Sequence, residues 1–509
     1  MGGEAADPSG LPVSGHRDFF AESSPVFIEI TVATNLFPKL SKRSREYVPA
    51  SFSVGTTRLD QVGIRLKGIS TFQPIQGRPS LAVKFDQFLP GQRMGRLSKL
   101  LLNNGGRDLY PFREGLACFL FRDAGLPAAR TRHVRLSLNG RNLGVYLAVE
   151  SMNKDFLRRN FGDDSGNLYE GFMQDINGEL ELDNGNDASR ADLRALRKAL
   201  AIPDPSVRRR EVNSLLDVDR FMAFAVLNLF LGTEDGYLSN GNNYRVYHDP
   251  VSRRLVFIPH GLDATFICGR PVNPPLTNAI VMRGLYSLPH GPELYQSNAW
   301  RLLTNTWRLA TITNRIAESV RELIALSYKE SERAHWVEWG EVLCSQVTAR
   351  RQEILAALSQ PHTVQAEFDS EGVALLTNWF PIAHGNSPWF GMATNADRVF
   401  LQIEAVRPSA GSWRTRVSVP EGAYSISCRA RSKGRMGSVA TSYPAARVSL
   451  GGGASGAAVV KNGEWEDLSF SFRAPAGGLV AELICEYQSG IGEVMFELPS
   501  LRISSRSTP

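Results

Sequence analysis

The chain has 509 residues, of which 43% are hydrophobic and 21% charged, and 57 basic against 51 acidic residues give a net charge of +6. This length exceeds what one hydrophobic core usually supports, so two or three domains are expected. So small a charge, with no dense Lys/Arg run among aromatic residues, argues against binding to nucleic acid. No stretch approaches the ~18 apolar residues of a membrane-spanning helix. The N-terminus lacks a signal-peptide pattern, so the compartment stays open between cytoplasm and cell surface.

The first part of the chain is predicted to be mainly β. Residues 1–22 are rich in Gly, Pro and Ser and are expected to be disordered. Short alternating runs between residues 26 and 88 then predict strands, because glycines separate them. A helix is predicted over 110–125. A β-hairpin is predicted over 133–150, with Asn139-Gly140 as its turn.

A predominantly helical part follows. Helices are predicted over 186–201, 217–232 and a long stretch from 292 to 360. The first folded domain is therefore placed at 23–362, as a β-rich part with one embedded helix followed by a helical part. Its fold class is predicted to be α+β.

Helical periodicity stops near residue 362, and the region 366–509 reads as an all-β sandwich. Short alternating strands recur there with turn residues between them. Its tryptophans could stack on sugars, although each is predicted to be core: Trp379, Trp389, Trp413 and Trp465. Cys428 and Cys485 could pair or remain buried free thiols. The five cysteines form no CxxC motif, so no zinc site is expected.

The stretch "TEDGYLSNGNNYRVY" carries the strongest chemical signal. Phosphoryl transfer needs a cation over the phosphates, carboxylates and amides that hold magnesium, and a base for the acceptor hydroxyl. Asp235 precedes Asn240 by five positions, the spacing of the catalytic Asp and metal-binding Asn in protein kinases. Asp263 follows an apolar strand in "VFIPHGLDATF" and would supply a second carboxylate to the metal.

An ordinary surface turn is the alternative for this stretch. Asp, Asn and Gly are common in turns because they tolerate left-handed backbone and bond their own main chain. The consecutive Asn242 and Asn243 favour a phosphate-handling loop, because a plain turn between apolar segments needs no such concentration of amides.

The β-rich part offers two candidates for the lysine that neutralises phosphate. They are Lys67 in "IRLKGIST" and Lys84 in "SLAVKF", and an exposed strand lysine is the alternative for either. Glu114, on the helix that follows, could pair with this lysine, although it also suits the first turn of a helix. Gly68 permits close approach of the backbone, and Ser70 adds a hydroxyl. The glycine-rich loop of protein kinases is absent.

Together these segments resemble the spore-coat-protein-H (CotH) kinase family. The resemblance covers residues 26–360 in the same order, and it also includes "GNLYEG", "LDVDRFMAF" and "PHGLDATF". It implies an atypical bilobed protein-kinase-like fold that binds ATP with Mg²⁺ or Mn²⁺. It further implies phosphorylation of Ser or Thr on a protein substrate, such as a surface or spore coat protein.

The resemblance also implies roles for individual residues. Asp235 matches the catalytic Asp, and Asp263 matches the metal Asp. Asn240, Asn242 and Asn243 fall near the nucleotide or metal, with Asn240 and Asn243 as metal ligands. The nucleotide-binding set is Lys67, Ser70, Lys84, Glu114, Glu150 and Met152, the last two in the segment expected to face adenine.

Two positions depart from the family pattern. Many members have two acids in the segment of Asp263, whereas the first is Gly261 here, and many have Lys where this chain has Glu170. These departures keep open a catalytically weak or inactive surface, adhesion or assembly protein on a kinase-like scaffold. The C-terminal region resembles a carbohydrate-binding-type jelly roll, which implies a glycan as a further partner.

Overall fold

The computed structural model describes most of the chain. The described residues are 18–21, 24–40, 46–69, 71–105, 112–272, 279–286, 288, 291–359, 363–376, 379–384, 388–395, 398–406, 409–435, 445–450, 456–459, 461–475, 478–488 and 491–506. The chain divides into two compact units, Met1–Ile354 and Leu355–Pro509. The division falls inside the last helix of the first unit, slightly before the predicted boundary at 362. That each unit folds alone stays a prediction.

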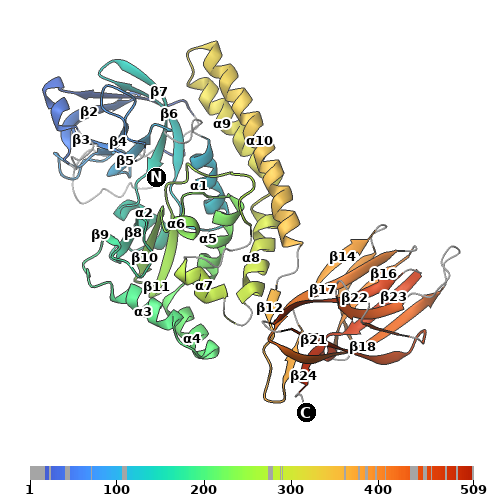
Figure 1. The fold of residues 1–509 in the computed structure, drawn as a ribbon. Coiled ribbons are helices and arrows are strands. Elements are labelled where there is room, and N and C mark those ends of the chain that lie inside the picture. Colours follow the sequence, from blue (N-terminus) through green and yellow to red (C-terminus); the bar gives the residue numbers. More distant parts are fainter. Residues whose placement is uncertain are drawn as a thin grey trace, which may run out of the picture. The chain divides into compact units, whose positions relative to one another are not determined.

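Seven strands of the first unit form a closed barrel in the order β1-β2-β3-β4-β5-β7-β6 (Figure 1). Their bounds are β1 (Phe27–Val32), β2 (Val48–Val54), β3 (Thr57–Lys67), β4 (Ser80–Lys84), β5 (Lys99–Asn103), β6 (Thr131–Leu138) and β7 (Arg141–Glu150). Alternate side chains such as Ile64 and Leu66 fill the barrel, so Lys67 points outward. The barrel closes through parallel pairing of β1 with β6, which local sequence patterns did not reveal.

The predicted β-hairpin is confirmed. Asn139 and Gly140 connect β6 and β7 with φ of 50° and 73°, the left-handed conformations that a tight two-residue hairpin turn requires. The predicted helix over 110–125 is α1 (Arg113–Asp123).

Part of the segment predicted to be disordered is packed against the barrel. Phe19 is buried in the barrel core, and Arg132 Nη1 donates to its main-chain oxygen at 2.6 Å. Asp18 also forms an ion pair with Arg130 at 2.5 Å. For residues 18–21 the structure therefore differs from the expectation. Residues 1–17 and 22 lie outside the described part.

The helical part of the first unit surrounds a small sheet of order β11-β10-β8-β9. Its strands are β8 (Leu168–Gly171), β9 (Glu181–Asn184), β10 (Tyr244–Asp249) and β11 (Arg254–Pro259). Its helices are α2 (Lys154–Phe161), α3 (Ala191–Leu200), α4 (Pro205–Leu215), α5 (Val218–Phe230), α6 (Tyr237–Asn240), α7 (Ile280–Tyr286), α8 (Gly291–Asn305), α9 (Leu309–Ala325) and α10 (Glu330–Leu358). The predicted stretch 292–360 is thus three helices. The turns between them contain no Gly or Pro, so no residue in the sequence signals that a helix stops there.

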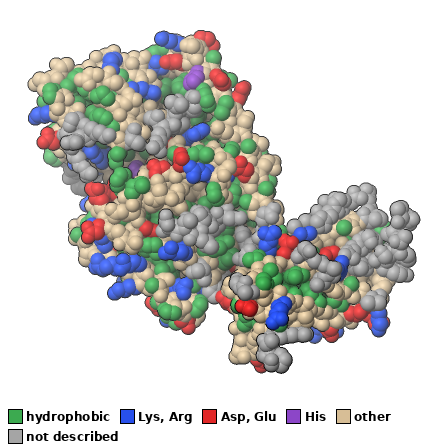
Figure 2. Space-filling view, in the orientation of Figure 1, with side chains coloured by type: hydrophobic (Ala, Val, Ile, Leu, Met, Phe, Trp, Pro, Cys, Tyr) green, Lys and Arg blue, Asp and Glu red, His purple; other side chains and the backbone are tan. Residues whose placement is uncertain are grey.

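Charges are mixed on the visible face of the first unit. Figure 2 shows basic and acidic side chains interspersed on its visible face, with several basic side chains near α3 and α4. This distribution agrees with a small net charge. Among the helices in the described part of the chain, none has the length and hydropathy needed to cross a membrane.

The second unit is a sandwich of two sheets, as predicted. One sheet contains β12 (Thr363–Gln365), β14 (Phe380–His384), β17 (Ala410–Val419), β19 (Ala445–Leu450), β20 (Gly456–Ala458) and β22 (Leu479–Gln488). The other contains β13 (Val373–Leu375), β15 (Trp389–Asn395), β16 (Arg398–Ala405), β18 (Gly422–Arg435), β21 (Trp465–Ala474), β23 (Ile491–Glu497) and β24 (Arg502–Arg506).

The core between these sheets accounts for both cysteines and for only some of the tryptophans. Cys428 and Cys485 are buried free thiols in this core. Trp413 is buried in it, and Trp379 packs against it partly buried. Trp389 is 55% exposed, so the prediction that it is core is wrong.

Candidate active site

The polar loop from Thr233 to Asn243 follows α5 and is anchored by buried groups. Asp217 caps the start of α5, where its side chain accepts from Arg220 N. At the other end, Arg350 is fully buried and its guanidinium donates to the main-chain oxygens of Leu229 and Phe230. A cation at this helix terminus satisfies carbonyl groups that lack partners within the helix. Arg350 therefore fixes the point at which the loop leaves α5.

Two buried tyrosines, one within this loop and one directly after it, support the loop. Tyr237 and Tyr244 are buried with ring centroids 4.7 Å apart, and Tyr244 stacks on Phe257 of β11. Tyr237 also donates to a carboxylate oxygen of Asp175 at 3.0 Å. The tyrosines are thus buried, whereas Asp235 and the asparagines at 240, 242 and 243 are only partly buried.

The loops that carry Asp235 and Asp263 lie side by side. Glu234 N donates to Ala264 O at 3.1 Å, and Phe266 N donates to Leu231 O at 2.5 Å. Any Cβ at Gly232 would lie 2.2 Å from a main-chain oxygen of this second loop, so the approach requires glycine. Main-chain bonds therefore hold the two predicted acids at one end of the small sheet.

Two asparagines orient the Asp235 carboxylate. Asn240 Nδ2 donates to Asp235 Oδ1 at 2.7 Å, and Asn242 Nδ2 donates to the same oxygen at 2.8 Å. Asn243 Nδ2 donates to the main-chain oxygen of Asp235 at 2.8 Å. Within the described residues no donor contacts Asp235 Oδ2. That oxygen is thus open to a donor from outside the described residues.

The side-chain amide of Asn103 bridges Lys67 and Glu114. Lys67 Nζ donates to Asn103 Oδ1 at 2.6 Å, and Asn103 Nδ2 donates to Glu114 Oε2 at 2.8 Å. The negative charge of Asp263 acts on both Lys67 and Glu114, which brings the barrel groups to the loop of the helical part. The structure therefore brings together the predicted lysine, helix glutamate and metal acid.

Burial shifts the pKa values of Lys67 and Glu114, the two ends of this bridge. Burial lowers the pKa of Lys67, against the negative charges of Glu114 and Asp263. Burial, with the charge of Asp263 adding to it, raises the pKa of Glu114 to about 7, while Asn103 and Lys67 oppose the rise. The site therefore holds ionisable groups that are poorly solvated, as is common where charge is handled in a reaction.

The raised pKa of Glu114 predicts how stability depends on pH in the metal-free protein. The folded state binds this proton more tightly than the unfolded chain, whose carboxyl has a pKa near 4.5. Its stabilising effect is fully present below pH 4.5 and is lost as pH rises through about 7. As pH rises from about 4.5 to 8, the free energy of unfolding should fall in both proteins. The fall should be on the order of 3 kcal/mol smaller in Glu114→Gln than in wild type, at about 1.4 kcal/mol per pKa unit. Urea denaturation across this range measures the difference, and parallel curves would contradict the prediction.

Lys84 lies apart from this cluster. Lys84 is 40% exposed and lies 4.0 Å from Asp86. It is four residues along β4 from Ser80, the cross-strand partner of Lys67, which is about 14 Å of strand. The bridge through Asn103 to Glu114 and the influence of the Asp263 charge thus distinguish Lys67 from Lys84. Ser70 lies outside the described residues.

The segment expected to face adenine is held by structural contacts. Glu150 is buried, and its carboxylate forms ion pairs with Arg130 at 2.9 Å and Arg159 at 2.6 Å. Met152 is partly buried against a small apolar cluster that includes Phe156. The Glu150 side chain therefore links the end of β7 to Arg130 and Arg159. The predicted contact of this segment with nucleotide would have to use other atoms.

The structure gives a physical reason for Gly261. Its φ is +56°, and a Cβ there would lie 2.6 Å from Asn243 Oδ1. An acid at this position would be strained and would displace the asparagine that holds the Asp235 main chain. The Asn243 side chain occupies the space beside residue 261, so Asn243 acts here in positioning the loop. Its role as a metal ligand stays a prediction.

Glu170 takes part in an ion-pair network. It lies opposite Arg245 on the neighbouring strand, with Nη2 and Oε2 3.1 Å apart, and Arg245 also pairs with Asp183. Desolvation, with the charges of Arg245 and Lys67 adding to it, lowers the pKa of the partly buried His260 to about 3. His260 is thus neutral near pH 7, and the charges of Arg245 on β10 and of Lys67 on β3 both act on its imidazole.

Sequence reasoning missed several basic groups around Lys67. The charges of Arg65 and Lys99 both act on Lys67, and Arg245 acts on Lys99. Arg65 shares the outward face of β3 with Lys67, a signal that the two-residue spacing on a strand contains. Lys99 and Arg245 come from other strands, so only the folded chain brings them there. These cations suit a ligand with several negative charges.

The donor set fits a divalent cation. Asn240 Oδ1 is buried and accepts no hydrogen bond from any described residue. Asp263 is on the loop that main-chain hydrogen bonds join to the segment before Asp235, and carboxylate and amide oxygens are ligands that Mg²⁺ prefers. Among the described residues, no group of three His, Cys, Asp or Glu side chains is arranged to hold a metal. A metal here would rest on the Asp263 carboxylate, the Asn240 amide oxygen and oxygens of the substrate.

Comparison with protein families gives the chain its assignment. The model of the CotH kinase protein family matches residues 64–331, which is more than half of the chain and includes Lys67, Glu114, Asp235 and Asp263. The chain belongs to the CotH kinase protein family. This confirms the resemblance drawn from its motifs. Among curated proteins compared with the chain, none matches it significantly.

Solved structures similar to part of the chain include carbohydrate-binding modules. A CBM4 structure is 13% identical, with 25% of this chain and 86% of that chain covered and a TM-score of 0.20. The family 11 module from Clostridium thermocellum, in complex with a β-1,3-1,4-mixed-linked tetrasaccharide, is 12% identical over 28% and 100%, with a TM-score of 0.19. CsCBM6-3 from Clostridium stercorarium, in complex with cellobiose, is 15% identical over 29% and 98%, also at 0.19. TM-scores this low support no conclusion about this chain.

Proposed function

We propose that this CotH family member is an atypical, bilobed kinase that transfers the γ-phosphate of ATP to Ser or Thr of a protein substrate. The observation that carries the proposal is the convergence of Lys67, Asp235 and Asp263 from the barrel and from two joined loops. Convergence of this kind supplies the positioning and charge stabilisation on which phosphoryl transfer depends.

Each residue has a distinct task in this proposal. Lys67 would neutralise phosphate oxygens while Asn103 and Glu114 hold it in place. Asp235 would accept the proton of the substrate hydroxyl at Oδ2, because Asn240 and Asn242 occupy Oδ1. Asn240 Oδ1 and Asp263 would hold Mg²⁺ or Mn²⁺, which when bound neutralises charge on the phosphates.

Replacing each candidate lysine by methionine, in two separate variants, tests the proposal. Lys67→Met should weaken binding of ATP with Mg²⁺ at least tenfold, because it removes the cation on which the charges of Glu114 and Asp263 act. Lys84→Met is the matched control and should leave binding within about twofold, because Lys84 faces Asp86 and is partly exposed. Isothermal titration of full-length protein measures both. Equal loss in the two variants, or loss only in Lys84→Met, would contradict the assignment.

A catalytically weak or inactive surface, adhesion or assembly protein is the second candidate. The observation that favours it is Gly261, where packing of Asn243 leaves no room for the second acid of the family pattern. A protein of this kind need not transfer phosphate even if it binds nucleotide. Phosphate transfer itself therefore separates the two candidates.

We further propose that the sandwich binds a glycan and so places the kinase near a surface or coat polymer that contains its protein substrate. The support is the two-sheet architecture together with aromatic side chains that are not in the core, such as Trp389. Pull-down of full-length protein on insoluble polysaccharides tests this role.

A further inference from the structure

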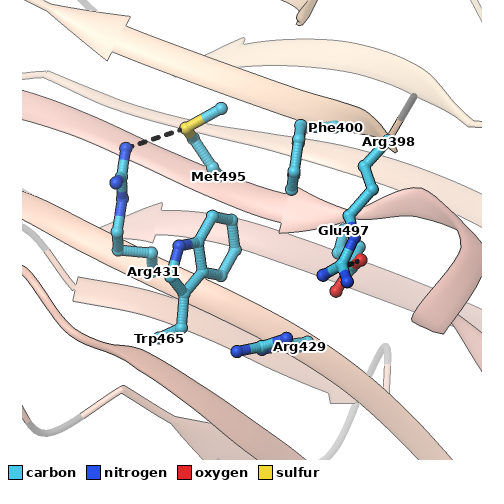
Figure 3. A pocket seen from close by; sticks show the side chains of 7 residues that line it. All are labelled: Arg398, Phe400, Arg429, Arg431, Trp465, Met495 and Glu497. Atoms are coloured by element: carbon cyan, nitrogen blue, oxygen red, sulfur yellow. Dashed lines mark hydrogen bonds and ion pairs between the residues drawn. The ribbon is translucent and has the colours of Figure 1, made fainter. Parts of the chain in front are cut away.

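The outer face of one sheet in the sandwich contains a small pocket of about 220 Å³ (Figure 3). Its walls come from four strands, β16, β18, β21 and β23. The residues that line it are Arg398, Phe400, Arg429, Arg431, Trp465, Met495 and Glu497. Their strand neighbours, such as Leu401 and Ala430, are in the sandwich core, so strand alternation directs the lining residues away from that core.

The pocket is rich in arginine and its charges are not fully balanced. Arg398 pairs with Glu497 at 3.0 Å, and Arg431 pairs with Glu493 at 2.9 Å. Within the described residues Arg429 forms no ion pair. Its cross-strand partner, Asp467, is exposed. Three arginines against two glutamates leave one net positive charge.

Arg431 also has a donor without a partner. Its Nη2 contacts Glu493 and, at 3.2 Å, Met495 Sδ, whereas its Nε is buried and has no hydrogen-bond acceptor among the described residues. An unsatisfied buried donor on a charged group is costly unless a ligand supplies the acceptor. An acceptor oxygen of a bound ligand would satisfy this donor.

Trp465 holds the arginines in place. Figure 3 shows its indole between the side chains of Arg431 and Arg429, whose guanidinium carbons lie 5.1 and 5.8 Å from the ring centroid. Cation–π contacts of this kind orient guanidinium groups without neutralising their charge. Phe400 lies 5.2 Å from Trp465 between ring centroids and adds an apolar wall. The expectation that Trp465 is a core residue is therefore wrong.

We propose that this pocket binds a carboxylated sugar ring, a uronic acid residue of an acidic polysaccharide. Planar guanidinium groups bind carboxylates through paired hydrogen bonds, and one net positive charge suits a monoanion. The volume is below the roughly 300–1,000 Å³ of sites for drug-sized ligands, so it suits one ring of a chain. Phe400 and Met495 would cover the apolar face of that ring. The inference rests on the proposed glycan-binding role of the sandwich and gives it a site and a charge class.

Calorimetric titration of full-length protein tests the inference. The probes are oligomers of galacturonate, glucuronate and mannuronate, each beside its neutral methyl ester. At least one acid form should bind ten times more tightly than its ester, and Arg429→Gln should weaken this binding tenfold or more. Arg473→Gln is the matched control, because Arg473 is exposed on β21 eight residues from Trp465, about 27 Å of strand. Trp465→Leu should weaken binding as well, and melting curves show whether each variant is folded.

The alternative outcomes separate this inference from the role on which it rests. Equal binding of acid and ester, or binding unchanged by Arg429→Gln, would overturn the pocket assignment and leave glycan binding standing. Preference for dextran sulfate or a phosphoserine peptide, lost in Arg429→Gln, would overturn the carboxylated sugar. Absence of binding to every charged and neutral glycan would overturn both the inference and the glycan-binding role.

Discussion

Replacing Asp235 with asparagine is expected to lower the rate of phosphate transfer at least a hundredfold while nucleotide binding persists. An asparagine can keep its Oδ1 bonded to Asn240 and Asn242. Its amide nitrogen would then take the place of Oδ2, and an amide cannot accept the proton of a substrate hydroxyl. Loss of a general base typically costs a factor of about 10² to 10⁴. Initial rates at saturating ATP measure the effect.

The neighbouring acid provides the control for this variant. Glu234 is adjacent in sequence, is largely exposed and pairs with Arg270 at 2.8 Å. Glu234→Gln removes the same charge from the same loop and should change the rate by less than about threefold. If Asp235→Asn and Glu234→Gln have equal rates, Asp235 is not the base.

Replacing Asp263 with alanine is expected to abolish the stabilisation that Mg²⁺ adds to the ATP complex and to reduce transfer at least a hundredfold. A ligand stabilises only the state that binds it, and Asp263 is the proposed carboxylate of the metal site. Its loop is joined to that of Asp235 by main-chain bonds, so the rest of the site should persist. Thermal unfolding with ATP, with and without Mg²⁺, measures the change.

Asp219→Ala is the control for the metal variant. Asp219 is an exposed acid in the first turn of α5 and is not on the joined loops. It should leave the Mg²⁺ effect intact. An Mg²⁺-dependent rise in melting temperature that is equal in Asp263→Ala and wild type would mean that other residues hold the ion.

The chemistry of the loops could be predicted because it is local in sequence. Five positions separate Asp235 from Asn240, and the structure shows these two side chains in contact. The hairpin turn at Asn139 and Gly140 is equally local, since left-handed backbone selects these residues. Features that depend on a few neighbouring residues can therefore be predicted from the sequence before the fold is known.

The choice of lysine could not be made from sequence. Lys67 and Lys84 both point outward from barrel strands, and alternation alone treats them alike. Asn103, which bridges Lys67 to Glu114, lies on β5, and its role appears only when β3, β4 and β5 are side by side. Closure of the barrel by β1 and β6 is another contact between distant segments.

Long-range anchoring was also beyond sequence reasoning. Arg350 on α10 bonds carbonyl groups at the end of α5, and nothing in the local pattern of α10 distinguishes this arginine from exposed ones. The predicted helical stretch 292–360 gave no sign of the two turns inside it, because neither contains Gly or Pro. Tertiary contacts set these features.

Transfer of ³²P from [γ-³²P]ATP to protein in the presence of Mg²⁺ tests the central claim most directly. Full-length protein should label a surface or coat protein, or itself, and mass spectrometry should locate the phosphate on Ser or Thr. Asp235→Asn should abolish the label, and Glu234→Gln should retain it. Binding of ATP with Mg²⁺ but no label on any protein, or equal label with Asp235→Asn, would contradict the proposed kinase.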